Sequence, residues 1–168
     1  AREILLLAPG NKPRLFETEA SAPAFSPDGR WIAYASPASG NSSVFVRPAS
    51  GEGKWQVSPE FGSYPRWSGD GRELFYIGIG SPQRPLMAVS VEGGPAFRTG
   101  PPRVIVPDLS RYMTSTAPQL DWDAAPDGRR FVFVEVERAK DEGTRIDVAL
   151  HWARHLDAAR PGVPDPAR

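Results

Sequence analysis

The sequence predicts an all-β fold built from repeated units of about 42 residues. Three segments each place an Asp-Gly-Arg signature before an apolar stretch: Phe25 to Tyr34, Trp67 to Tyr76 and Trp122 to Phe133. Asp28 and Asp70 lie 42 positions apart, and Asp127 follows Asp70 after 57. Proline (19) and glycine (16) make about a fifth of the 168 residues, and turns at that frequency favour short strands. A period of about 42 residues is typical of a four-stranded β-propeller blade.

Each repeat carries a hairpin turn at its Asp-Gly pair. Ser26-Pro27-Asp28-Gly29 places proline second and glycine fourth, as a type I turn prefers. Glycine can adopt the positive φ that leads the chain into the next strand. The aspartate suits the turn because its side chain can bond nearby backbone groups. We therefore assign a structural turn role, rather than calcium binding or catalysis, to Asp28, Gly29, Asp70, Gly71, Asp127 and Gly128.

Strands are expected on both sides of each turn. Short strands precede the turns at Phe25, Trp67 and Trp122 to Ala124, and apolar strands follow at Trp31 to Tyr34, Glu73 to Ile77 and Phe131 to Val136. Third and fourth strands are predicted at Val44 to Val46, Lys54 to Val57, Leu86 to Val89 and Arg103 to Val106. The apolar strands carry apolar residues on both faces, as in sheets that are covered on both sides.

The two ends of the chain predict incomplete blades. Ile4 to Leu7 and Arg14 to Glu17 read as the last two strands of a preceding blade, and Ile146 to Trp152 as a third strand. The predicted organisation is one partial propeller over residues 1–160, with blades at about 1–20 (partial), 21–60, 61–107 and 118–152. A short helical turn is expected at 153–160 and a disordered tail at 161–168, which holds three prolines.

The stretch Phe25-Ser-Pro-Asp-Gly-Arg-Trp-Ile-Ala-Tyr34 resembles the TolB-like, WD-like propeller repeat. The similarity covers about residues 1–152, and Gly62 to Tyr76 is its most specific part. It also resembles the C-terminal propeller half of large bacterial proteins, some with a serine/threonine kinase domain. The resemblance implies a propeller of six to eight blades used in protein interaction or sensing, and it favours a periplasmic or other extracytoplasmic location. The chain departs from that pattern in length, because about three blades cannot close a ring.

Composition excludes several classes of partner. Twenty basic and twenty acidic residues give a formal net charge of zero, so no basic excess indicates nucleic-acid binding. Cysteine is absent, which excludes disulfides and thiolate zinc sites. The longest apolar run, Ile4 to Ala8, is far shorter than the roughly 20 residues of a membrane span.

Few residues suggest chemistry, and we expect neither catalysis, nor a metal, nor a cofactor. His151 and His155 lie four residues apart, but no third ligand accompanies them. Asp121 and Asp123 offer paired carboxylates, yet they flank an apparently buried Trp122 and are expected to point outward. Core packing is the expected role of the five tryptophans, 31, 55, 67, 122 and 152.

Binding residues are expected in the long segment from Pro107 to Pro118, which extends the third repeat. Loops of this kind often carry the contact residues of a rigid scaffold. Arg111 and Tyr112 in this segment, together with Asp121 and Asp123, are the candidate binding residues, against the alternative of an irregular loop.

The sequence favours a non-enzymatic propeller segment for protein interaction or sensing, completed by self-association or by a larger parent chain. A homodimer would form a ring of about six blades, in which the N-terminal strands of one copy complete the last blade of the other. The alternative is the accessory propeller of a peptidase or receptor kinase whose catalytic domain is absent from this sequence. A small catalytic propeller is the third possibility, and it would need acidic and histidine residues that converge on a central channel.

Overall fold

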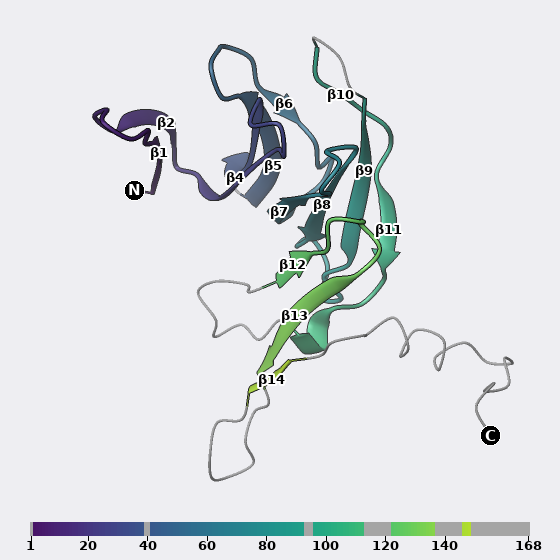
Figure 1. The fold of residues 1–168 in the computed structure, drawn as a ribbon. Coiled ribbons are helices and arrows are strands. Elements are labelled where there is room, and N and C mark those ends of the chain that lie inside the picture. Colours follow the sequence, from purple (N-terminus) through teal and green to yellow (C-terminus); the bar gives the residue numbers. More distant parts are fainter. Residues whose placement is uncertain (1, 39–40, 93–95, 113–121, 137–145, 149–168) are drawn as a thin grey trace, which may run out of the picture.

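The computed structural model describes residues 2–38, 41–92, 96–112, 122–136 and 146–148, which form four antiparallel sheets (Figure 1). The first sheet pairs β1 (Glu3–Leu6) with β2 (Arg14–Thr18). The second sheet has the order β3 (Ser21–Phe25), β4 (Trp31–Ala38), β5 (Asn41–Pro48) and β6 (Trp55–Gln56). These two sheets follow one another in the chain without a crossover.

The third sheet is built on β7 (Gly62–Trp67), β8 (Glu73–Gly78) and β9 (Leu86–Glu92). Its outer edge carries two short strands, β10 (Arg98–Thr99) and β11 (Arg103–Val106), which both pair with β9. A single 3-10 turn, η1 (Ser110–Tyr112), follows. The fourth sheet joins β12 (Trp122–Ala124), β13 (Phe131–Val136) and β14 (Ile146–Val148).

The predicted fold class is confirmed: the chain is an all-β arrangement of antiparallel sheets, and the sheets do not close into a ring. Details of the strands differ from the prediction. The outer strand of the third sheet is split in two, because Pro101 and Pro102 have no N–H group to donate to the ladder. β4 extends to Ala38 rather than ending at Tyr34, since β5 pairs along its whole length.

Some predictions lie outside the described residues. They include the C-terminal part of the predicted last strand (149–152), the helical turn at 153–160 and the tail at 161–168. The segment from 107 to 118 is described only as far as Tyr112, and this part contains the short 3-10 turn η1.

Neighbouring sheets pack face to face, so each central strand buries both of its faces. In β4, Ile32 and Tyr34 pack toward the first sheet, whereas Ala33 packs toward the third. In β8, the same alternation sends Leu74 toward the second sheet and Phe75 toward the fourth. Because side chains alternate faces along a strand, one apolar run contributes residues to the cores on both sides of its sheet. This explains why the strands after the turns carry runs of consecutive apolar residues, such as Ile32 to Ala35 and Leu74 to Ile77.

Aromatic residues dominate the core between the third and fourth sheets. Phe75 lies edge-on to Phe131 with 5.0 Å between ring centroids. Trp122 stacks on Phe133 at 5.7 Å and an interplanar angle of 9°. Such pairs contribute about 0.5–1.5 kcal/mol beyond the area that they bury. The short fourth sheet is thereby fixed to the third.

The first strands of the second and third sheets share an irregularity. Ala22 in β3 and Tyr64 in β7 both have positive φ, at 51° and 56°, and both precede a proline. The ladders shift register at these positions, between Ser21 and Ala24 and again between Ser63 and Arg66. A non-glycine residue in this conformation costs about 1–3 kcal/mol. The irregularity therefore belongs to the repeat, together with the proline that follows.

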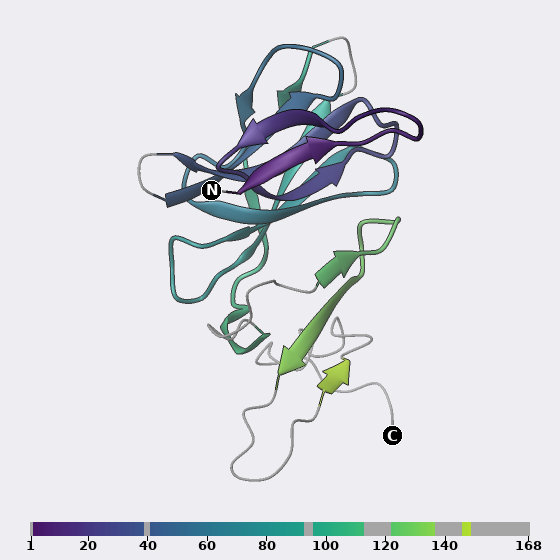
Figure 2. The same ribbon diagram turned by 90° about the vertical axis from the view of Figure 1, so that its left-hand side faces the viewer.

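The sheets follow one another in chain order, and the first and last sheets lie at opposite ends of the arrangement (Figures 1 and 2). No ladder joins β1 or β2 to any of the strands β12 to β14. The described residues therefore form an open arc, in which no described strand covers either end. Within the described residues, no helix is both long and apolar enough to cross a membrane.

Candidate functional site

The three Asp-Gly turns have nearly the same geometry. Gly29, Gly71 and Gly128 have φ values of 71°, 70° and 65°. In each turn the glycine N–H donates to the carbonyl of the residue three positions earlier, at 2.8–2.9 Å. The positive φ of the glycine and the hydrogen bond that closes the turn are the features that the sequence predicted for these residues.

The aspartates of the turns bond groups of their own turn. Asp28 Oδ1 accepts hydrogen bonds from the Ser26 hydroxyl at 2.6 Å and from the Arg30 N–H at 3.1 Å. These bonds, with the Ser26 hydroxyl foremost, lower the pKa of Asp28 to about 2. Asp70 repeats the pattern with the Ser68 hydroxyl and the Arg72 N–H. Each carboxylate is thus occupied within its turn, which leaves little of it for a ligand.

The third turn is simpler. Ala125 replaces the serine, so Asp127 accepts only the Arg129 N–H at 3.0 Å, besides an ion pair with Arg130 at 3.3 Å. The pKa of Asp127 is nevertheless lowered, chiefly by the Arg129 N–H. The backbone turn therefore forms without the serine.

The predicted binding residues Arg111 and Tyr112 lie in η1, against the fourth sheet. Tyr112 is half-buried and stacks on Phe133, with 5.9 Å between ring centroids. The Arg111 guanidinium lies 5.3 Å from the centroid of the Tyr112 ring and is exposed. Tyr112 is consequently a packing residue as much as a surface residue.

Asp123 is exposed on β12, as the sequence predicted for the residue after a buried tryptophan. Its carboxylate lies 4.0 Å from Arg66 Nε of β7. The Arg66 guanidinium also lies 5.8 Å from the centroid of the Trp122 ring. Asp121 lies outside the described residues, so the expected pair of carboxylates is described only at Asp123.

Together these contacts form an aromatic column with an arginine at each end. Its members run in the order Arg66, Trp122, Phe133, Tyr112 and Arg111. The column links η1 to β12, so the structure brings the two candidate regions of the sequence together on one set of stacked rings. Trp122 Nε1 is buried without a hydrogen-bond partner among the described residues. The column supports packing and contact with a partner; it holds no pair of groups arranged for proton transfer.

Metal chemistry finds no support in the described part of the chain. Among those residues, no three His, Asp or Glu side chains are close enough to share an ion. His151 and His155 lie outside the described residues.

The face of the second sheet that is turned toward the first sheet is exposed to solvent at Phe25. Phe25 pairs with Ile32, so its side chain is on the face toward the first sheet, and it is 58% exposed. Trp67 occupies the same place in the third sheet, paired with Leu74, and is only 8% exposed. The two residues differ because a complete sheet covers Trp67, whereas the first sheet has only two strands. Phe25 therefore lies on a part of the second sheet that the two strands of the first sheet do not cover.

The first sheet is itself covered on one face only. Ile4 and Phe16 are buried against the second sheet. Leu5 and Leu15 are cross-strand partners on the opposite face and are 53% and 51% exposed. Adjacent exposed leucines on an uncovered sheet are typical of a surface that contacts another protein segment.

A polar cluster fixes the first sheet to the second. The Glu17 carboxylate of β2 accepts the Tyr34 hydroxyl at 2.7 Å and pairs with Arg47 at 3.2 Å and Lys54 at 3.5 Å. Partial burial acts to raise the pKa of Glu17, but these partners outweigh it and the pKa is lowered. Glu17 is thus ionised in the folded protein near neutral pH.

The sequence reasoning did not identify the exposed residues Phe25, Leu5 and Leu15 as part of a candidate surface. The number of predicted strands did indicate this exposed surface, because two N-terminal strands cannot cover a four-stranded sheet. Tryptophan packing was predicted correctly for Trp67 and Trp122, which are buried, but Trp31 and Trp55 are only half-buried.

Comparison with known proteins gives relatives at the level of structure alone. No protein-family model matches the chain, and no curated protein sequence matches it. The structure of a putative TolB from Agrobacterium tumefaciens is similar with a TM-score of 0.56 and 18% identity. The match covers 87% of this chain and 52% of that chain. TolB from Acinetobacter baumannii matches with a TM-score of 0.49 and 15% identity, over 82% of this chain and 31% of that chain.

The chain thus spans about half the length of the Agrobacterium protein that it matches. The Agrobacterium structure carries the TolB name, which agrees with the TolB-like resemblance of the Asp-Gly repeat. An identity of 18% is informative about the fold and not about ligands or partners. The sheets, their chain order and this similarity show that the chain has the TolB-like β-propeller fold, as an arc that does not close.

Proposed function

We propose that this chain is a non-enzymatic propeller segment that acts by protein interaction or sensing, and that a second copy completes its ring. The observation that carries the proposal is the contrast between Phe25 and Trp67, which occupy the same repeat position with 58% and 8% exposure. An aromatic residue in a core position needs a covering sheet. Blades of a longer chain could supply that sheet, and the two sources are separated by the experiment below.

The repeat specifies which residue would cover Phe25. Trp67 packs in the same core as Ala33, which follows the turn aspartate of the preceding sheet by five positions. The residue at that place in the last sheet is Val132. Val132 lies between Phe131 and Phe133, which both face the third sheet, so its side chain points to the open side. We therefore expect Phe25 of one copy to face Val132 of the other.

The N-terminal sheet fits the same arrangement. If β1 and β2 of one copy extend the last sheet of the other, Leu5 and Leu15 are turned toward the third sheet of that other copy. Extension of a sheet by strands from another chain satisfies backbone groups that an open edge leaves unpaired. In such a dimer, the first sheet of each copy would meet the last sheet of the other copy, so that both ends of each arc are covered.

Cross-linking tests this geometry, because the chain has no cysteine of its own. Phe25→Cys and Val132→Cys variants are purified separately, mixed in urea so that their chains exchange, refolded together and treated with a bismaleimide whose spacer is about 10 Å, the separation of packed sheets. The expected product is a dimer that contains one chain of each variant.

Val104→Cys replaces Val132→Cys in the control mixture. Val104 is 55% exposed, so it is at least as accessible as the half-buried Val132, but it lies on β11 at the outer edge of the third sheet. Equal cross-linking in the control, or none in the Val132→Cys mixture of folded proteins, would contradict completion by a second copy. The second result would favour blades of a longer chain.

A further inference from the structure

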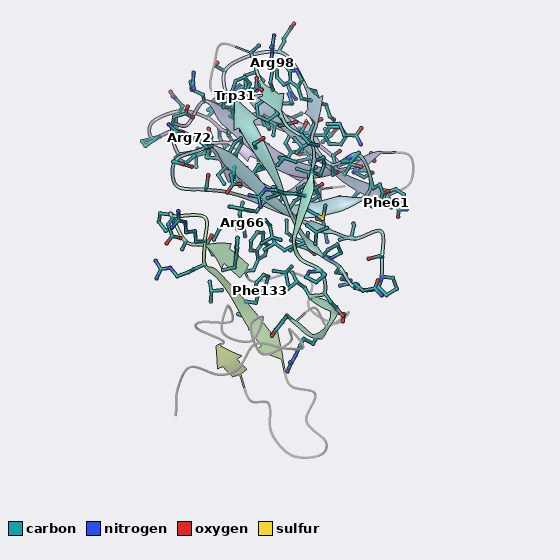
Figure 3. The ribbon with its side chains drawn as sticks, turned by 90° about the vertical axis from the view of Figure 1, so that its right-hand side faces the viewer. Trp31, Phe61, Arg66, Arg72, Arg98 and Phe133 are labelled. Atoms are coloured by element: carbon teal, nitrogen blue, oxygen red, sulfur yellow. The ribbon has the colours of Figure 1, made fainter. Side chains whose placement is uncertain are left out.

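A hollow of about 340 Å³ lies between the first two Asp-Gly turns. Trp31 and Trp67 line it, together with residues of both turns and Glu92 at the end of β9. Its volume is at the small end of the range of ligand pockets, about 300–1,000 Å³. Figure 3 shows Trp31 and Arg72 on the same side of the molecule, opposite Phe61. The hollow is separate from the open ends of the arc and from the aromatic column.

The next pair of turns is in direct contact. The Gly69 N–H donates to the Pro126 carbonyl at 3.0 Å, and a Cβ at Gly69 would lie only 2.7 Å from the Pro126 side chain. Neighbouring turns in this fold can therefore pack against each other. The space between the first two turns is a feature of that pair, and the repeat does not require it.

Trp31 departs from the repeat pattern. The residues at its position in the other two turns are Glu73 and Arg130, so the turn itself needs no aromatic side chain there. Trp31 is half-buried, with Trp55 edge-on at 5.7 Å and Phe97 at 5.2 Å between ring centroids. These neighbours hold the indole in place while part of it lines the hollow.

Two charged groups in the hollow are available to a ligand. Asp28 and Asp70 are bonded within their turns, and Arg30 pairs with Asp28 at 2.6 Å. The side chains of Arg72 and Glu92, by contrast, make no hydrogen bond or ion pair among the described residues. The hollow thus offers the planar N–H donors of Arg72, the carboxylate acceptor of Glu92 and the aromatic surface of Trp31. The charges of Arg72 and Glu92 cancel.

This combination suits a neutral ligand that carries several hydroxyl groups on an apolar ring. A sugar ring can lay its C–H face on an indole, while its adjacent hydroxyls donate to a carboxylate and accept from a guanidinium. A charged ligand would be attracted by one of the two groups and repelled by the other. We propose that the hollow between the first two turns binds a neutral sugar residue, with Trp31 beneath the ring and Arg72 and Glu92 at its hydroxyls.

Saturation-transfer NMR on the full chain, with maltose, cellobiose and chitobiose as probes, tests the proposal. At least one disaccharide is expected to bind with a millimolar dissociation constant and to change tryptophan fluorescence. Arg72→Ala and Glu92→Gln are each expected to weaken that binding at least fivefold. Both residues are on the rim of the hollow, so neither change removes a core contact.

Arg129→Ala is the matched control, because Arg129 follows the same Asp-Gly pair in the third turn, outside the hollow. It should leave the affinity unchanged. Failure of all three sugars to bind, or equal losses in the Arg72→Ala and Arg129→Ala variants, would overturn the proposal. The hollow is formed within a single chain, so sugar binding does not depend on ring completion. The sugar proposal can therefore fail while ring completion stands, and ring completion can fail while the sugar proposal stands.

Discussion

The turn residues Asp28, Asp70 and Asp127 show what local sequence determines in this fold. Their partners lie within three residues along the chain, so the turn can be inferred from the residues that form it. The role of Phe25 could not be inferred in this way. Its exposure depends on how much of the second sheet the two-stranded first sheet covers, and only the count of N-terminal strands suggested that the first sheet is incomplete.

Gly71→Ala is expected to lower the free energy of unfolding by about 1–2 kcal/mol, because alanine is strained at a φ of 70°. A Cβ at Gly71 would meet only Pro27, at 3.5 Å, so the cost arises from the backbone rather than from a clash. Urea denaturation measures the change.

Gly51→Ala is the control for this prediction. A Cβ at Gly51 has no neighbour within 4 Å, and its φ is not positive. Similar losses in the Gly71→Ala and Gly51→Ala variants would mean that the turn conformation is not what makes glycine necessary at position 71.

The acid sensitivity of the first turn follows from Asp28. Its pKa is about 2 in the folded protein and 3.8 ordinarily, so the charged carboxylate stabilises the fold above pH 3.8. This contribution is lost as the pH falls from about 4 to about 2. Because the side chain is exposed, solvent screening limits the effect to below about 1 kcal/mol.

The Asp28→Asn variant isolates this contribution. The difference in urea midpoint between the wild type and Asp28→Asn should shrink as the pH is lowered from 5 to 2. A constant difference across that range would show that the charge of Asp28 does not stabilise the turn.

At the scale of elements, the repeat period predicted most strands because each sheet is a unit of consecutive strands. The division of the outer edge into β10 and β11 was missed, although Pro101 and Pro102 supply its cause. The aromatic column was also missed. It assembles Arg66, Trp122 and Tyr112 from three separate elements, and no local pattern specifies which of these rings meet.

The first sheet is expected to depend on Glu17. Glu17→Gln keeps the shape of the side chain but removes the charge that pairs with Arg47 and Lys54. Hydrogen bonds to charged groups contribute about 1.5–3 kcal/mol, so local opening of β1 and β2 should become easier by about 1–2 kcal/mol. Amide hydrogen exchange should therefore accelerate at residues 3–18.

Exchange in β7 to β9 should be unchanged in the Glu17→Gln variant, since these strands belong to another sheet. Glu52→Gln provides the control, because Glu52 is exposed and lies outside the cluster. Uniform acceleration over all sheets would show that the first sheet does not open independently.

At the scale of the whole molecule, the four described sheets form an arc whose first and last sheets have no described sheet beyond them. The strand count of the sequence already indicated an arc, and the similarity to half of a TolB structure agrees with it. The sequence could not indicate the hollow beside Trp31. That space depends on the distance between two turns, which is set by the packing of whole sheets rather than by either turn.

The central claim, that a second copy closes the arc, is tested most directly by light scattering of the wild-type chain over a range of concentrations. The account predicts a species of twice the 18.3 kDa chain mass that persists as the protein is diluted to low micromolar concentration. A monodisperse species of 18.3 kDa at all concentrations would contradict it, because Phe25, Leu5 and Leu15 would then remain exposed in a stable monomer.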